Sequence, residues 1–249
     1  MATDKTRALV LRAVDFSETS KIVTFYTEDL GKISALAKGG RRLKSKFEVA
    51  LDLLSVCVIC IIRKPSAELD LLTEATLEER FPGLTRDLHS LHSAYYVAEI
   101  LDGLTQKGDP HPPLFHETIR VLRRLEQGED RLLSLARYQL LLLRELGYAP
   151  NLEGCASCGG GVRLTASTTF SATAGGLLCA DCARFQSGSQ TIQGGTVRLL
   201  QRMLKDDEAA MDRLAVSTHA RGELWRVVTT GIHGLLGRRP RTAAMLELP

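Results

Sequence analysis

Two cysteine pairs constrain the fold of this chain more than any other feature. They follow the spacing C-x2-C-x20-C-x2-C. A turn at each pair can aim two sulfurs at one point, and two such turns supply the four tetrahedral ligands that Zn²⁺ prefers. Gly159 suits the tight turn after the first pair, and Gly175-Gly176 suits a hairpin before the second. Four thiolates leave no open position for a substrate, so we predict one structural zinc ion, held by Cys155, Cys158, Cys179 and Cys182.

The competing interpretation of these cysteines is a disulfide framework or unpaired thiols. The first seven residues, Met1–Arg7, are polar and lack the apolar core of a secretion signal. No apolar run reaches the ~18 residues that span a bilayer, because Asp52 and Ser55 interrupt the longest one. We therefore expect a cytoplasmic protein without a membrane segment, where structural disulfides are rare.

A third C-x2-C, formed by Cys57 and Cys60, lies inside an apolar run rich in Val and Ile. That run predicts a strand, and residues three apart on a strand point to opposite faces. The two sulfurs should diverge. We interpret both as small buried apolar residues rather than as metal ligands.

The first part of the chain predicts strands without intervening helices. Five short apolar runs within about 75 residues favour a small closed barrel over a parallel α/β sheet. An OB-fold is the economical choice, although strand period alone does not separate it from an SH3-like barrel. The runs are Ala8–Leu11, Lys21–Tyr26, Lys32–Ala37, Leu51–Ile61 and Leu69–Thr76.

After Pro82 the apolar spacing becomes helical. One stripe comprises Leu84, Leu88, Leu91, Tyr95, Ala98, Leu101 and Leu104, and a second helix carries Phe115, Ile119, Leu122 and Leu125. A third helix, Leu132–Leu146, is apolar on most sides and should be central, with Gly147 as its stop. Two more helices are expected at 196–204 and 218–236, the last capped by Ser217.

Together these patterns predict a multidomain α+β protein. An N-terminal OB-fold β-barrel covers residues 1–80, and an α-helical bundle domain begins at 81–153. A zinc-binding insert with the four cysteines, at 154–188, interrupts the bundle, which resumes at 189–249. The helices on the two sides of the insert should pack together.

The basic residues are concentrated in the predicted barrel. Residues 1–64 hold 12 Lys and Arg against 7 Asp and Glu, a balance of +5, whereas the whole chain carries +3. The segment 38–46 has five cations and no acid, which suits contact with a phosphate backbone. The alternative is an ordinary solvated charge run. The same alternative is our preferred interpretation of a second cluster, Arg238, Arg239 and Arg241.

The sequence carries no motif for catalysis or nucleotide binding. It has no G-x-x-x-x-G-K-[ST], no G-x-G-x-x-G after a strand, no H-E-x-x-H and no G-x-S-x-G. His89 and His92 share a helix face, but no third ligand accompanies them, so we interpret them as a solvated or core pair. Every specific signal therefore favours binding.

Several segments resemble the RecO family of bacterial recombination mediators. The N-terminal ones are Val10–Arg12, Glu18–Val23, Thr27–Ile33 and Ala37–Arg42. The central ones are Leu146–Leu152, Cys155, Cys158-Gly159, Gly175–Cys179 and Cys182. They occur in the family's order along about three quarters of the chain, and their combination is specific.

The resemblance implies a non-enzymatic DNA repair protein with an OB-fold, a helical domain and a zinc insert. Such proteins bind single- and double-stranded DNA and anneal complementary strands. With RecR, they help load RecA onto DNA covered by single-strand-binding protein, and they act at the nucleoid in the cytoplasm. For phosphate contacts we predict Lys38, Arg41, Arg42, Lys44 and Lys46, with Arg12 and Lys21 as weaker candidates.

Three other hypotheses stay open at this point. OB barrels and zinc ribbons also serve RNA, so an RNA-binding protein is the first. The second is a zinc hydrolase with an unrecognised site. The third is a protein-interaction scaffold whose basic loop is incidental.

Overall fold

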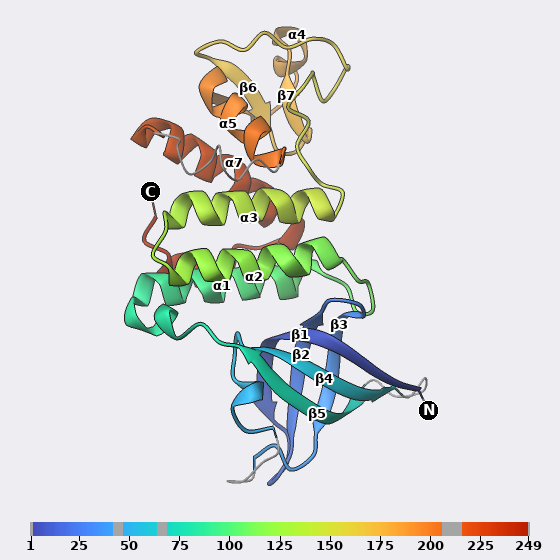
Figure 1. Ribbon diagram of the computed structural model, residues 1–249. Helices are drawn as coiled ribbons and strands as arrows, with labels where there is room; N and C mark the ends of the chain where they lie inside the picture. Colours follow the sequence, from blue (N-terminus) through green and yellow to red (C-terminus); the bar gives the residue numbers. More distant parts are fainter. Residues whose placement is uncertain (1, 42–46, 64–68, 206–215, 249) are drawn as a thin grey trace. The chain divides into compact units, whose positions relative to one another are not determined.

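Figure 1 shows the computed structural model of the protein, which describes residues 2–41, 47–63, 69–205 and 216–248. Packing divides the chain into two compact units, residues 1–128 and 129–249. The predicted fold class is confirmed, with a β-barrel in the first unit and the four clustered cysteines in the second. The finer boundaries after residues 80, 153 and 188 stay predictions.

Five strands close into a barrel in the order β1-β2-β3-β5-β4, and β4 pairs back onto β1. Only β3 and β5 run parallel, which gives the OB topology (Figure 1). The long strand β1 pairs with β4 through its first half and with β2 through its second. A register shift between Val10 and Arg12 lets it curve between these partners. The strands are β1 (Ala2–Asp15), β2 (Lys21–Thr27), β3 (Gly31–Ala37), β4 (Val56–Arg63) and β5 (Asp70–Glu79).

Alternating side chains fill the barrel. Along β3, Ile33, Ala35 and Ala37 are buried, while the residues between them are half-buried on the outer face. The fourth strand begins later than predicted, at Val56 rather than Leu51. Residues Glu48–Leu51 form a short 3-10 helix, η1. Phe47, Ala50 and Leu51 belong to the barrel core, so this apolar stretch is buried in a helical turn instead of a strand.

Two helices complete the first unit, α1 (Leu88–Leu104) and α2 (Pro112–Glu126). The predicted face of α2 is buried as expected. The predicted stripe of α1 needs correction: Leu84 lies in a separate 3-10 helix, η2 (Pro82–Arg86), and Leu88 is 62% exposed. Asp87 starts α1 by accepting hydrogen bonds from the N–H groups of His89 and Ser90. Along α1, Ala94, Val97, Ala98 and Leu101 are buried, so the buried face overlaps the predicted stripe only at Ala98 and Leu101.

In the described part of the second unit, α3, α5 and α7 pack around one core, and α3 is the central helix of the three. The helices that flank the insert in sequence, α3 and α5, pack together and with α7, which confirms that expectation. Ser217 caps α7 as predicted, accepting a hydrogen bond from the N–H of Ala220. A three-stranded sheet in the order β7-β6-β8 stands at one end of this unit (Figure 1). The elements are α3 (Arg131–Glu145), β6 (Thr168–Ser171), β7 (Gly176–Leu178), α4 (Ala180–Ala183), β8 (Gln190–Ile192), α5 (Gly194–Leu204), α7 (Thr218–Leu236) and a 3-10 helix, η3 (Arg241–Met245).

From here on, the insert means residues 154–192, which take in the three-stranded sheet, and it shares its core with the helices. Phe170, Leu177 and Ile192 come from its three strands. They are buried in a single cluster with side chains of the helices, among them Leu140 of α3 and Val197 of α5. The strands of the insert are too short to be stable alone. The sheet that carries the cysteines is therefore built onto the helical core.

Candidate functional site

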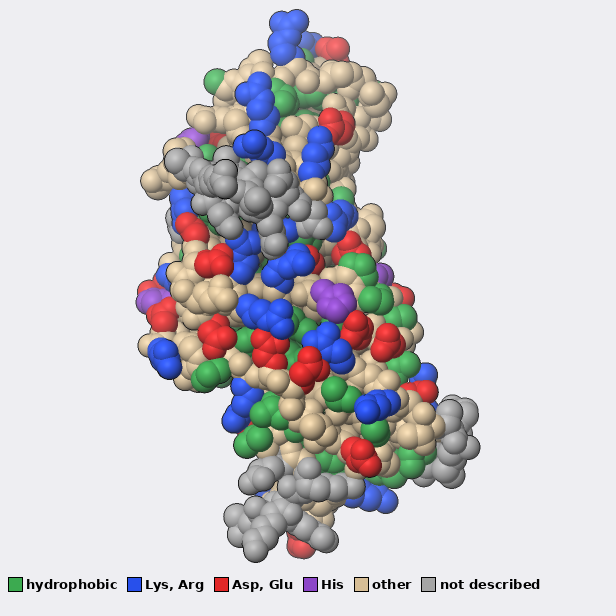
Figure 2. Space-filling model, viewed as in Figure 1, with side chains coloured by type: hydrophobic (Ala, Val, Ile, Leu, Met, Phe, Trp, Pro, Cys, Tyr) green, Lys and Arg blue, Asp and Glu red, His purple; other side chains and the backbone are tan. Residues whose placement is uncertain are grey.

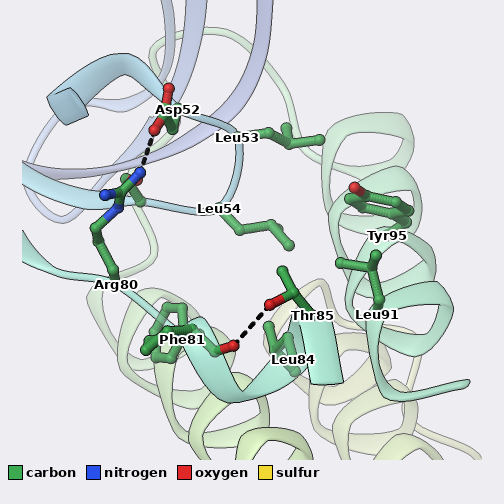
Figure 3. Close-up of a pocket in the computed structure, with 11 residues that line it drawn as sticks. Asp52, Leu53, Leu54, Arg80, Phe81, Leu84, Thr85, Leu91 and Tyr95 are labelled. Atoms are coloured by element: carbon green, nitrogen blue, oxygen red, sulfur yellow. Dashed lines mark hydrogen bonds and ion pairs between the residues drawn. The ribbon is translucent and has the colours of Figure 1, made fainter. Parts of the chain in front are cut away.

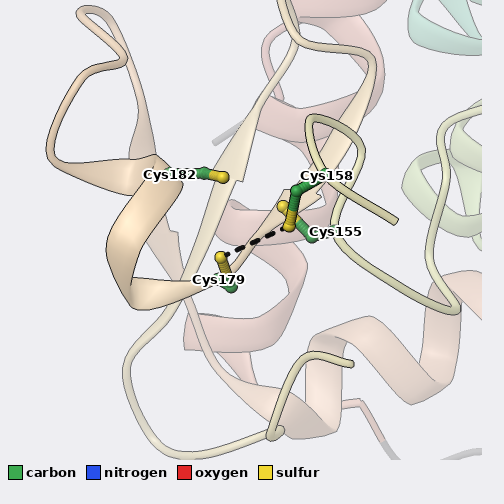
Figure 4. Close-up of side chains that lie close together, drawn as sticks. All are labelled: Cys155, Cys158, Cys179 and Cys182. Carbon is green, nitrogen blue, oxygen red and sulfur yellow. Dashed lines mark hydrogen bonds between the residues drawn. The ribbon is translucent and has the colours of Figure 1, made fainter. Parts of the chain in front are cut away.

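The four predicted metal ligands converge. All four Sγ atoms lie within 4.8 Å of one another (Figure 4). The Sγ atoms of Cys158 and Cys179 are 3.8 Å apart. A tetrahedral zinc ion with Zn–S bonds of about 2.3 Å sets sulfur–sulfur separations of about 3.8 Å. The residues present therefore fit a tetrahedral metal ion.

Backbone hydrogen bonds shape the first cysteine turn. The N–H of Cys155 donates to Gly160 O at 2.8 Å, and the N–H of Gly159 donates back to Cys155 O at 2.8 Å. Gly159 has φ +74°, a conformation that favours glycine, as the sequence predicted. Cys155 is buried, and Cys158 at the outer side of the turn is exposed.

The second turn follows the predicted hairpin between β6 and β7, where Ser171 pairs with Gly176. A Cβ on Gly176 would lie 2.3 Å from Asn151 O, so only glycine fits there. Asn151 ties the two turns together: its N–H donates to Gly175 O, and its side-chain oxygen accepts from the N–H of Glu153 and Gly154. Cys179 then begins the short helix α4, which carries Cys182.

Ionisation of all four cysteine thiols requires a nearby cation. Backbone N–H groups of Cys179 and Cys158 point at Cys155 and lower the pKa of its thiol to about 6. A hydrogen bond from Ser157 favours ionisation of Cys182, but the surrounding sulfurs of Cys179 and Cys158 outweigh it and raise the pKa of Cys182 to about 12. Four adjacent thiols cannot all become thiolates unless a positive ion compensates their charge.

The sulfurs of the third cysteine pair diverge as predicted, but only Cys57 is buried, and Cys60 is half-buried. Cys57 points into the barrel and is fully buried, whereas Cys60 lies on the outer side of β4. Burial raises the pKa of Cys57 to about 12. Among the described residues, the only group of three or more His, Cys, Asp or Glu side chains placed to hold a metal is the set of four cysteines in the second unit. His89 and His92 thus stay outside any such group.

The described members of the predicted DNA-contact set gather at one end of the barrel. Lys21 pairs with Asp15 on β1 and with Ala37 on β3, and Lys38 follows directly. The N–H of Arg41 donates to Thr19 O at 3.1 Å, which brings Arg41 to the β1–β2 loop, residues 16–20. Arg12 lies further along β1, opposite Thr24. Arg42, Lys44 and Lys46 fall outside the described residues.

The cations of the first unit divide into two groups. Arg7 is bound by both carboxylate oxygens of Glu78, and Lys32 forms an ion pair with Asp102 at 3.2 Å. By contrast, Arg12, Lys21 and Lys38 form no ion pair with any described residue. Arg41 is intermediate, since its guanidinium bonds Ser17 O at 2.7 Å and Asp15 at 3.2 Å. Some of the guanidinium N–H groups of Arg41 therefore bind the β1–β2 loop.

Elsewhere, Lys and Arg side chains are scattered among acidic ones over the face seen in Figure 2. The cluster Arg238, Arg239 and Arg241 is exposed, in keeping with a solvated segment. None of the described helices is both long and apolar enough to cross a membrane.

The first unit also has a pocket of about 530 Å³ between the segment before β4 and the helices η2 and α1 (Figure 3). Leu53, Leu54, Leu91 and Tyr95 face this space. Its charged lining residues, Asp52 and Arg80, form an ion pair with each other. The half-buried part of the α1 stripe therefore faces this pocket instead of the core.

Two features were missed by sequence reasoning. Phe16 in the β1–β2 loop is 61% exposed, and no periodicity marks a loop aromatic. Glu223 on α7 is buried and accepts hydrogen bonds from the N–H of Gln193, at 3.0 Å, and from the Thr196 hydroxyl. It caps the start of α5 from a helix distant in sequence. Only the long-range packing reveals this role.

The chain joins an OB-topology barrel to a helical unit that carries four clustered cysteines, which is the architecture of a multidomain α+β protein with a candidate metal site. Sequence comparisons identify the family. The model of the N-terminal domain of recombination protein O matches residues 1–81, and that of its C-terminal domain matches residues 85–244.

Individual relatives carry the same name. The chain is 44% identical over 202 residues to the DNA repair protein RecO of Rhodopirellula baltica, covering 81% of this chain and 75% of the relative. It is 32% identical to the DNA repair protein RecO of Anaeromyxobacter sp. (strain K), covering 98% of this chain and 95% of the relative. The chain therefore belongs to the RecO family of DNA repair proteins.

Proposed function

We propose that this protein is a non-enzymatic recombination mediator that binds single- and double-stranded DNA and anneals complementary strands. With RecR it would help load RecA onto DNA covered by single-strand-binding protein, acting at the nucleoid in the cytoplasm. Membership of a DNA repair family supports this role. The observation that carries it is the group of cations without a described ion pair, Arg12, Lys21 and Lys38, at one end of an OB barrel.

Annealing requires a protein to offset the repulsion between two polyanions. Cations that are not engaged in internal ion pairs are available to replace the counterions of a phosphate backbone. No nucleotide hydrolysis is needed, because duplex formation is itself favourable. Arg42, Lys44 and Lys46 would extend the cationic surface from the segment that follows Lys38 and Arg41.

We further propose that the metal is one zinc ion with a structural role. Cys155, Cys158, Cys179 and Cys182 would hold it, and it would supply positive charge to compensate their thiolates. Four protein sulfurs fill a tetrahedral shell, which leaves no position for a reacting water. This full shell supports a binding protein over a zinc hydrolase.

The test is the annealing rate of two complementary fluorescent oligonucleotides without nucleotide, at low and moderate salt. The wild type should accelerate annealing, more so at low salt. Neutralising Lys38→Ala, Arg41→Ala and Arg42→Ala together should abolish the acceleration. The matched control, Arg238→Ala, Arg239→Ala and Arg241→Ala, removes the same charge and should keep it.

Three results would contradict the proposal. Folded, zinc-loaded wild type that fails to accelerate annealing at any salt would remove the activity. Tighter binding of RNA than of the matched DNA single strand would favour the RNA-binding alternative. Equal losses of annealing activity in both triple variants would show that the DNA-binding surface is not at the barrel end.

A further inference from the structure

We propose that Phe16 is a base-stacking residue for single-stranded DNA on the barrel, an inference that rests on the proposed DNA-binding function. The chain has seven phenylalanines. Five are buried, at 6% exposure or less, whereas Phe16 is 61% and Phe185 is 89% exposed. A single exposed aromatic ring is normal on a protein surface, so a role for Phe16 has to be argued from the residues around it.

The loop that carries Phe16 is braced. The N–H of Phe16 donates to Ser20 O at 3.0 Å, and the N–H of Ser20 donates to Ser17 Oγ at 3.2 Å. From the other side, Arg41 bonds the loop at Thr19 O and Ser17 O. The ring is therefore presented on a preformed loop, so a ligand would lose little free energy to ordering the backbone.

The surface next to this loop carries apolar and polar side chains, most of them half-buried. We define the outer face as the outward side chains of β1, β2 and β3, namely Arg12, Val14, Ile22, Thr24, Ser34 and Leu36. Val14 pairs with Ile22, and Ile22 pairs with Leu36, so these three form one row across the strands. All three are half-buried. Phe16 comes two residues after Val14 in the chain, just beyond the end of β1.

The charged side chains around this row indicate which kind of ligand it would bind. Arg12 on the outer face is joined by Lys21, Lys38 and Arg41 near the loop, against the acids Asp15 and Glu18. Asp15 is already bonded to Arg41. An aromatic ring flanked by available cations suits bases that stack while their phosphates meet Lys or Arg, as on other OB barrels. A protein partner would have to leave those cations unpaired or bring acids of its own.

The experiment compares two oligonucleotides of equal length, oligo(dT) and a chain of abasic residues, by fluorescence anisotropy at fixed salt. Phe16→Ala should weaken oligo(dT) binding about tenfold and leave binding of the abasic chain unchanged, because only the first has bases to stack. Phe16→Trp should retain the wild-type affinity, and Phe16→Leu should behave like Phe16→Ala. Phe185→Ala, which removes the other exposed phenylalanine, should have no effect.

The outcomes separate this inference from the proposed function. Wild type that binds neither oligonucleotide would contradict both. Wild type that binds oligo(dT) while Phe16→Ala binds it equally well would overturn the stacking role alone. Equal losses on both oligonucleotides, or full affinity in Phe16→Leu, would also overturn it. Thermal unfolding of each variant should match the wild type, since an exposed ring adds little to the fold.

Discussion

The β-barrel and the four-cysteine insert each carry a candidate site, but the site residues contribute differently to the stability of the two regions. The barrel is a closed sheet with its own apolar core, and its candidate contacts are surface side chains that the fold does not need. The insert has strands of three or four residues, and its candidate site is the set of four sulfurs at its centre. Removing the site residues should therefore spare the barrel and disrupt the insert.

The cysteines repeat this contrast within one motif. In β4 an extended backbone sends Cys57 inward and Cys60 outward. In the insert, tight turns aim the same C-x2-C spacing at a single point. The C-x2-C spacing therefore indicates a metal site only where the backbone turns between the two cysteines.

The largest expected effect is that of metal removal. Chelation, or Cys179→Ser, should abolish binding of one zinc ion per chain and expose amides of residues 154–192 to hydrogen exchange, because structural zinc contributes about 10 kcal/mol or more in small zinc modules. Amides of the barrel strands should keep their protection. The matched variant Cys60→Ser should keep the zinc. Unchanged protection in the metal-free insert would contradict the contrast between the two regions.

The next effect concerns the junction where the insert returns to the helices. Glu223→Ala leaves the N–H of Gln193 and the Thr196 hydroxyl without their buried acceptor, and should destabilise the protein by about 2–4 kcal/mol. Glu223→Gln retains one acceptor oxygen and should cost less. Urea unfolding measures both variants. Equal stability of Glu223→Ala and wild type would show that the α5 cap is dispensable.

A smaller effect tests the apolar role of the cysteine inside the barrel. Cys57→Ser places a hydroxyl in the core and should lower the free energy of unfolding by about 1–3 kcal/mol. The zinc content should not change. Cys60→Ser, on the outer face, should be within about 0.5 kcal/mol of wild type. A larger loss of stability in Cys60→Ser than in Cys57→Ser would contradict the assignment of Cys57 to the inner face of β4 and Cys60 to the outer face.

The smallest effect is electrostatic and belongs to the helices of the second unit. Burial alone would raise the pKa of Asp130, but hydrogen bonds from Arg221 and the N–H of Leu133 outweigh it and hold the pKa below its usual value. A lowered carboxyl pKa adds stability above the usual carboxyl range and loses it as the pH falls through the folded-state value. Because both side chains are partly exposed, Asp130→Asn should cost about 0.5 kcal/mol at pH 7.

This difference between Asp130→Asn and wild type should shrink as the pH falls below about 4. Urea midpoints measured between pH 7 and pH 3 check it. A penalty that is constant over this range would exclude the ion pair with Arg221 as its origin.

Local patterns in the sequence predicted most of the architecture. Five short apolar runs indicated the five strands, helical spacing indicated α2 and α3, and cysteine spacing indicated the candidate metal ligands. Prediction failed where long-range packing decides: Leu51 lies in a 3-10 helix that adds side chains to the barrel core, and Leu88 of α1 is exposed. Phe16 and Glu223 could not be found in advance, because exposure and distant hydrogen bonds leave no periodic signal.

The central claim is that the available cations of the barrel hold the DNA backbone, and the salt dependence of oligo(dT) binding tests it most directly. In the variant Arg12→Ala, Lys21→Ala and Lys38→Ala, three fewer phosphates are neutralised, so the slope of log K against log salt should become shallower by about 2. Lys32→Ala, which removes a cation already paired with Asp102, should keep the wild-type slope. A triple variant that is folded and retains the wild-type slope would contradict the account.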